Sequence, residues 1–149
     1  MKKIGEYTCM GTLDEIEAGT SYKINLFDGR FDTAYKVVDF QVWPVNMTDY
    51  KEEICYGRLC TEDLAMTAAN FFRADENRQI GWAVSSTDNA PNAGSWKVLD
   101  EDNLIVEDLF VQMLSANEQP ANYLIKMEKY DISEWRGALA MVRNSAQNV

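Results

Sequence analysis

The feature that most constrains the fold is a succession of short segments with alternating side chains, separated by turn-forming residues. In one of them, Tyr22, Ile24 and Leu26 alternate with polar neighbours, which is typical of a half-buried strand. Similar segments cover about residues 4–13, 21–26, 34–43, 54–61, 79–85, 96–99, 104–114 and 123–128. About eight strands at such short spacing predict a mainly β fold, an antiparallel β-sandwich of jelly-roll-like type.

Turn chemistry agrees with this pattern. Asp28-Gly29 is a pair that closes tight turns, and Pro44 ends the segment before it because proline lacks the amide hydrogen of a strand ladder. The segment 104–114 is unusual, since apolar residues occupy both of its faces around Glu107. We expect one strand there, buried on two sides or bulged near Glu107.

Two segments predict helical structure. Residues 62–70 (EDLAMTAAN) favour one or two helical turns. Asp131 and Glu134 have the spacing of an N-terminal capping box, which predicts a short C-terminal helix over 131–147. Its apolar residues recur on one side of that helix: Trp135, Leu139 and Val142. This stripe packs either on the chain's own sheet or on a neighbouring subunit.

Length and hydropathy indicate one soluble unit. A chain of 149 residues predicts a single domain, 1–149, with one core. No apolar run approaches the roughly 18 residues of a transmembrane helix, so we expect no membrane partner. Residues 1–6 contain no apolar core of a secretory signal.

Charge and residue types narrow the chemistry. The formal charge is −10 and no basic run exists, so we expect no direct nucleic-acid binding. The chain has no histidine, which excludes Ser-His-Asp and Cys-His catalysis. Cys9, Cys55 and Cys60 lack zinc or redox spacing, and we expect them to be reduced and apolar.

Clustered carboxylates offer two further possibilities. The acidic turn 100–103 does not begin a calcium-binding loop of the helix-loop-helix type. Such a loop has glycine at its sixth position, and counting from Asp100 that position is Ile105. Glycoside hydrolysis needs two carboxyl groups about 5–9 Å apart, a distance that no sequence fixes. The candidates are Asp28, Asp32, Asp39, Glu107 and Asp108. We therefore expect no enzyme, no metal and no cofactor, with an acidic hydrolase as a remote alternative.

Tryptophan supplies the candidate contact residues, because aromatic faces suit sugars and protein interfaces. Trp82 and Trp135 lie on apolar faces, so we expect both in the core, although Trp135 also belongs to the stripe that can cover a neighbour. Trp43, beside Pro44, and Trp96, at a loop edge, are the better contact candidates.

Several stretches carry a family resemblance: residues 26–35 (LFDGRFDTAY), 77–83 (NRQIGWA), 102–109 (DNLIVEDL) and 122–133 (NYLIKMEKYDIS). Their order and spacing resemble small structural proteins of marine bacteriophages. The resemblance implies a capsid or capsid-surface protein present in many copies, and it transfers no catalytic or metal-binding residue. Acidity favours the outer surface of a virion, and unpaired cysteines agree with assembly in a reducing host cytoplasm.

The resemblance therefore implies a virion structural protein that builds or decorates a bacteriophage capsid. Its partners are copies of itself and other capsid proteins, in a homo-oligomer of a large assembly. The expected interface residues are Trp43, Trp96, Trp135 and Leu139. The alternative is a lectin-like carbohydrate-binding module that holds sugars on aromatics such as Trp96. Main shell subunit and decoration protein stay open.

Overall fold

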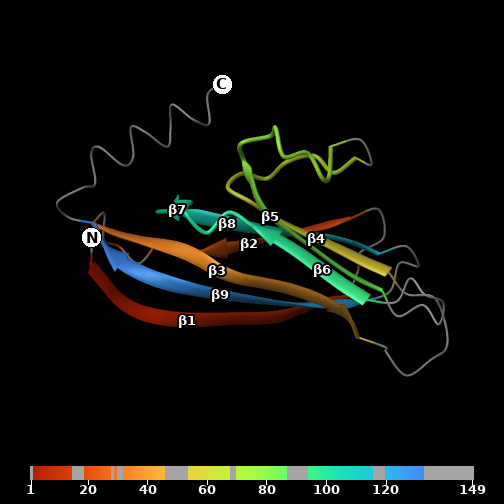
Figure 1. Cartoon of the computed structure of the whole chain (residues 1–149), viewed down its shortest axis with the longest axis horizontal. Helices are drawn as coiled ribbons and strands as arrows, with labels where there is room; N and C mark the ends of the chain where they lie inside the picture. Colours follow the sequence, from red (N-terminus) through yellow and green to blue (C-terminus); the bar gives the residue numbers. More distant parts are fainter. Residues whose placement is uncertain are drawn as a thin grey trace.

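The computed structural model describes residues 2–14, 19–27, 29, 32–45, 54–67, 70–86, 94–115 and 120–132. These residues form two antiparallel sheets stacked as layers, a mainly β fold consistent with the predicted β-sandwich (Figure 1). The strands are β1 (Lys2–Leu13), β2 (Thr20–Asn25), β3 (Thr33–Pro44), β4 (Ile54–Cys60), β5 (Gln79–Ser86), β6 (Gly94–Leu99), β7 (Leu104–Ile105), β8 (Asp108–Ser115) and β9 (Ala121–Asp131).

Strand pairing is nested around the β4–β5 pair. Outside it come the antiparallel pairs β3–β7, β2–β8 and β1–β9. The resulting orders are β1-β9-β3-β7 in the four-stranded sheet and β2-β8-β4-β5-β6 in the five-stranded sheet. Strand β6 stands outside the nested set, because it pairs with β5 and extends the second sheet by one strand.

The core lies between the sheets and follows the two-residue period of the strands. Alternate residues of β8 and β9 point inward and are buried, and β3 follows the same rule on either side of a register shift between Val37 and Asp39. The sheets approach closely at Gly57 of β4, where a Cβ atom would lie 2.6 Å from Cγ1 of Val42 and 3.0 Å from Cζ of Phe40. A side chain at position 57 therefore has no room.

The expectation of one strand over 104–114 is wrong, although the interruption near Glu107 is confirmed. Residues 104–105 pair with β3 in one sheet, and residues 108–115 pair with β2 and β4 in the other. The chain changes sheets at Val106 and Glu107. Apolar residues occupy both faces because Ile105 and Leu109 enter the same core from opposite layers.

The predicted helical turns over 62–70 are also absent from the described part of that segment, residues 62–67 and 70. The carbonyls of Leu64 and Ala65 accept hydrogen bonds from buried side chains of the sheet instead of from helical amides. A C-terminal helix was predicted over 131–147. Asp131, its expected first residue, is instead the last residue of β9. Residues 133–147 lie outside the described residues.

Trp82 is not in the core between the sheets. The inward face of β5 carries Gly81 and Ala83, which pair with Leu59 and Gly57. Trp82 is therefore on the outer face, where its Nε1 donates to the carbonyl of Phe71 at 3.1 Å. Strict alternation would place Ile80 on the outer face with Trp82. The pairing with β4 shifts register between Leu59 and Cys60, so Ile80 has no partner there and its side chain joins the core.

Candidate functional site

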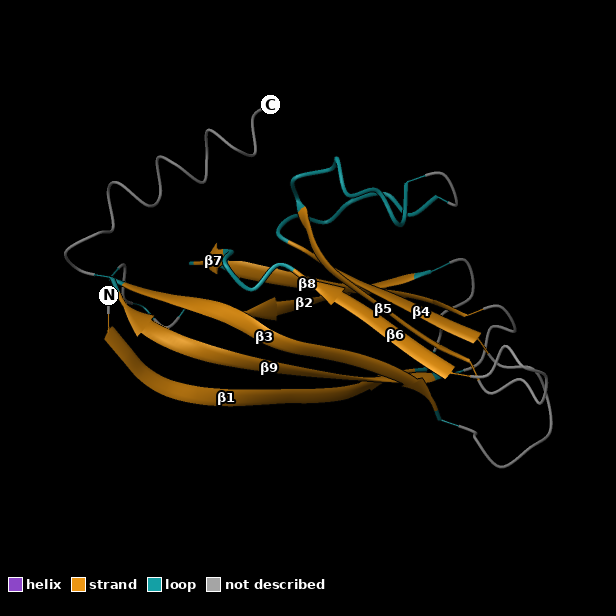
Figure 2. Cartoon of the chain, in the orientation of Figure 1, coloured by secondary structure: helices purple, strands orange, loops and turns teal. Residues whose placement is uncertain are grey.

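A long loop covers the outer face of the five-stranded sheet (Figure 2). Its described residues are 61–67 and 70–78, between β4 and β5. The side chain of Arg58 in β4 is fully buried beneath it. Arg58 donates from Nη1 to the carbonyl of Asn70 at 3.1 Å and from Nη2 to that of Ala65 at 3.0 Å. These bonds fix two separate parts of the loop to one strand.

Gln112 of β8 completes the attachment. Its Oε1 accepts from Nε of Arg58 at 2.6 Å, and its Nε2 donates to the carbonyl of Leu64 at 2.7 Å and to Oδ1 of Asp63 at 3.0 Å. Burial lowers the pKa of the Arg58 guanidinium, and burial raises the pKa of the Cys60 thiol to about 12. The Cys60 thiol is therefore neutral, and the polar groups of Arg58 and Gln112 have hydrogen-bond partners. The network is accordingly structural.

The described part of the loop presents one aromatic ring, that of Phe72, to solvent. The Phe71 ring lies 4.7 Å from the guanidinium carbon of Arg58 and is buried, while Phe72 points outward. The Phe72 ring centroid is 5.8 Å from that of Tyr56 and 5.8 Å from that of Trp96. We name Tyr56, Phe72 and Trp96 the aromatic ridge.

The ridge continues onto strand β6, which is an edge of the five-stranded sheet among the described residues. Five of its six residues are exposed. Trp96 and Val98 share the outer face of β6 and are 50% and 56% exposed. The ridge and Val98 form an uncharged surface on a chain of net charge −10.

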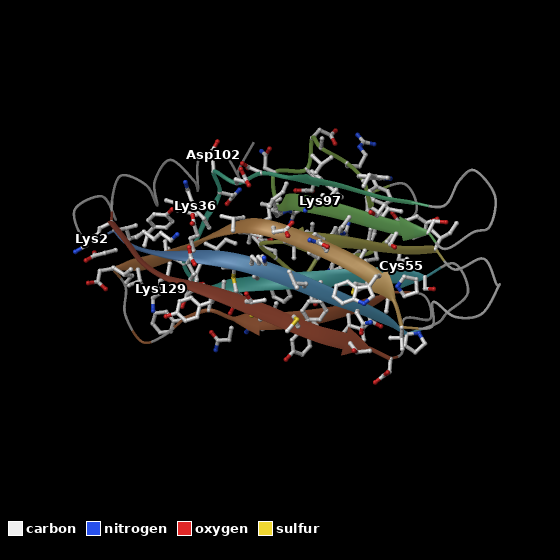
Figure 3. All side chains as sticks on the ribbon, turned by 60° about the horizontal axis from the view of Figure 1, so that its bottom comes forward. Lys2, Lys36, Cys55, Lys97, Asp102 and Lys129 are labelled. Atoms are coloured by element: carbon white, nitrogen blue, oxygen red, sulfur yellow. The ribbon has the colours of Figure 1, made fainter. Side chains whose placement is uncertain are left out.

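The charged residue of β6 faces the other way. Lys97 lies at the junction of the two sheets and forms an ion pair with Asp39 of β3 (Figure 3). Gln41 also donates to Asp39, at 2.8 Å. Burial raises the pKa of Asp39, but the hydrogen bonds from Lys97 and Gln41 outweigh it and hold the pKa below its ordinary value.

The predicted contact residues do not form one patch. Trp96 belongs to the aromatic ridge. Trp43 follows the core residue Val42 on β3, so it is on the outer face of the other sheet, where it is partly buried opposite Asn122. Trp135 and Leu139 lie outside the described residues.

Two of the candidate carboxylates, Asp39 and Asp108, are engaged in local contacts. Asp39 binds Lys97, and Asp108 lies 3.4 Å from Nζ of Lys23. Asp100 accepts from the backbone amide of Asp102 at 3.1 Å, which is the contact of a capped turn. Asp28 is not among the described residues, and those that are described contain no cluster of three or more metal-ligating side chains.

Sequence reasoning missed the partners of Trp96 and the network below them. Tyr56 and Phe72 are 16 residues apart in number and meet only because the loop folds back over β4. One signal was present: Arg58 is the single charge in the strand ICYGRLC. A lone charge in an apolar strand requires buried partners.

In comparisons with known proteins, no family model matches the chain and no curated protein sequence is similar to it. Within the part of the chain that the structure describes, no helix has the length and apolarity needed to span a bilayer.

Proposed function

We propose that this protein is a structural subunit of a bacteriophage virion, which builds or decorates the capsid through repeated contacts with its own copies and with other capsid proteins. The observation that carries the proposal is the uncharged surface formed by the aromatic ridge and Val98, which extends from β4 and the loop to the edge strand β6. Aromatic residues on a well-defined surface are the usual anchors of protein interfaces.

The strand order supports the finer part of the proposal, a jelly roll. A jelly roll is a long hairpin rolled up so that its antiparallel pairs nest around a central pair. The pairs β4–β5, β3–β7, β2–β8 and β1–β9 have this relationship, with β6 as an additional strand. Such sandwiches build viral shells and also occur in lectin domains.

Charge and thiol state favour a place on the outer surface of the virion. A chain of net charge −10 is repelled by packaged nucleic acid, whereas it keeps an exposed shell surface soluble. Cys9, Cys55 and Cys60 are free, which suits maturation in the reducing cytoplasm of a host cell.

Native mass spectrometry and electron microscopy of the purified chain test the proposal. We expect closed oligomers or particles that form in a concentration-dependent manner. Trp96→Ala should weaken assembly while leaving the urea-unfolding midpoint of the monomer nearly unchanged, because the side chain is half exposed. Tyr7→Ala is the matched control, because Tyr7 lies on β1 of the other sheet and is 49% exposed. Equal loss of folding and assembly in Trp96→Ala would assign Trp96 to the core and contradict the proposal.

A second function is favoured by the same ridge: a carbohydrate-binding module. The exposed rings of Phe72 and Trp96 have centroids 5.8 Å apart and planes inclined at 48°, and each offers a face on which a sugar ring can stack. This alternative predicts a monomeric chain that binds glycans on an array with micromolar to millimolar affinity. Binding that Trp96→Ala abolishes in a chain that does not assemble would replace the structural proposal.

A further inference from the structure

We propose that β6 pairs antiparallel with β6 of a second copy across a two-fold axis, with Trp96 opposite Trp96 of that copy. The two five-stranded sheets then become one continuous sheet with the aromatic ridges side by side. This inference deepens the proposed function, on which it rests, because it names one partner and the register of one contact.

Four strands stand at a sheet edge among the described residues, and β6 is the most open of them. The edge strand β7 has only two residues. Strand β1 carries three charged residues and a register shift between Lys3 and Gly5, both of which discourage pairing with another chain. Strand β2 is held by the loop, since Ser21 donates to Asp63 at 2.8 Å. The register of β6 on β5 is continuous over six residue pairs, and five of its residues are exposed.

The best partner for this edge is another β6. An antiparallel strand edge is self-complementary under a two-fold axis, so one strand supplies both sides of the ladder. The outer face of β6 carries Trp96 and Val98 and no charge, while the chain as a whole is strongly acidic. A basic partner would bind the acidic surface elsewhere on the chain. The uncharged face of β6 is instead complementary to the same face of a second copy.

Charge selects the register. Residues opposite each other in an antiparallel pair share a face, so a two-fold axis places one residue of β6 against its own copy. The two registers that pair the most residues of Gly94–Leu99 centre on either Trp96 or Lys97. The second arrangement opposes two like charges. The first places Lys97 opposite Ser95 of the second copy and leaves its ion pair with Asp39 intact. It also adds a cross-strand aromatic pair.

Analytical ultracentrifugation of the full chain tests the choice of edge. Val98→Lys puts a charge on the pairing edge and should shift the dimer dissociation constant upward by at least tenfold. The same change at Val106, which is 37% exposed and lies between β7 and β8, is the matched control and should leave the constant unchanged. Raising the ionic strength should tighten the dimer, because salt screens repulsion between two acidic chains.

Cross-linking tests the register. In a Cys9→Ser background, a mixture of Ser95→Cys and Lys97→Cys chains should form a mixed disulfide dimer under mild oxidation, because opposite Cα atoms in a ladder lie about 4.5–5.5 Å apart. Each variant alone should form little. Efficient cross-linking of Lys97→Cys to itself would overturn the register with Trp96 at its centre.

The outcomes separate this inference from the proposed function. Met10 lies on β1 and is 69% exposed. Assembly that survives Val98→Lys but is lost in Met10→Lys would place the contact on β1, which overturns the β6 pairing and keeps a self-assembling subunit. A chain that stays monomeric at every concentration and salt would contradict both. Loss of assembly in Val98→Lys together with the mixed cross-link supports both.

Discussion

Arg58 and Gln112 are opposite each other on neighbouring strands, fully buried, and joined by a hydrogen bond of 2.6 Å from Nε to Oε1. Through this pair, β4 and β8 hold the backbone of the loop at Leu64, Ala65 and Asn70. These hydrogen bonds fix the loop to the sheet, and the position of Phe72 in the aromatic ridge depends on them.

Arg58→Met should destabilise the fold strongly. The methionine fills much of the same volume but removes donors from two loop carbonyls and from Gln112, and buried acceptors without partners are costly. We expect the free energy of unfolding to fall by about 3 kcal/mol in urea titrations.

Arg73→Met is the control for this change. Arg73 lies on the same loop but is exposed and pairs with Asp75, so its loss should leave the free energy of unfolding nearly unchanged. Similar losses in the two variants would mean that the buried network contributes nothing beyond an exposed arginine.

Gly57→Ala should disturb the packing between the sheets. Its Cβ would lie 2.6 Å from Cγ1 of Val42, and β4 cannot shift because β5 and β8 flank it. Overpacking of this kind costs about 1–3 kcal/mol. In a double-mutant cycle, Gly57→Ala should cost less when Val42→Ala has made room, and additive costs would contradict a direct clash.

The strands could be predicted from the sequence because inward and outward residues alternate, as in β2, β3 and β9. The prediction failed where long-range contacts decide the structure. Residues 104–114 contain one apolar run whose two halves belong to different sheets, and the helical propensity of residues 62–67 is overridden by hydrogen bonds to Arg58 and Gln112. Trp96 was a correct choice of an exposed aromatic residue, but its neighbours Tyr56 and Phe72 come from separate segments, which periodicity does not bring together.

Thiol labelling should distinguish the three cysteines. Cys55 and Cys60 are buried, and burial raises the pKa of Cys60 to about 12, so neither forms an accessible thiolate. Cys9 is partly exposed. With Ellman's reagent near pH 8, we expect at most one thiol to react in the native protein and all three in urea. Rapid reaction of a second thiol, or of any thiol in Cys9→Ser, would show that the loop does not protect Cys60 or that Cys55 is open.

Acid should weaken the junction between β3 and β6. The folded-state pKa of Asp39 is below its ordinary value of 3.8, because the hydrogen bonds from Lys97 and Gln41 outweigh the effect of burial. Ionised Asp39 therefore contributes stability above pH 3.8, and that contribution disappears as the pH falls through the lower, folded-state pKa.

Asp39→Asn should consequently be less stable than the natural chain at neutral pH, and the difference should shrink as the pH falls from about 7 to about 2.5. Urea midpoints across this range measure the difference. The difference between Lys97→Met and the natural chain should shrink with falling pH in the same way. The double variant should lose no more stability than either single variant, because both substitutions remove the same interaction. A difference between Asp39→Asn and the natural chain that stays constant with pH would show that the ionised carboxylate does not hold the two strands together.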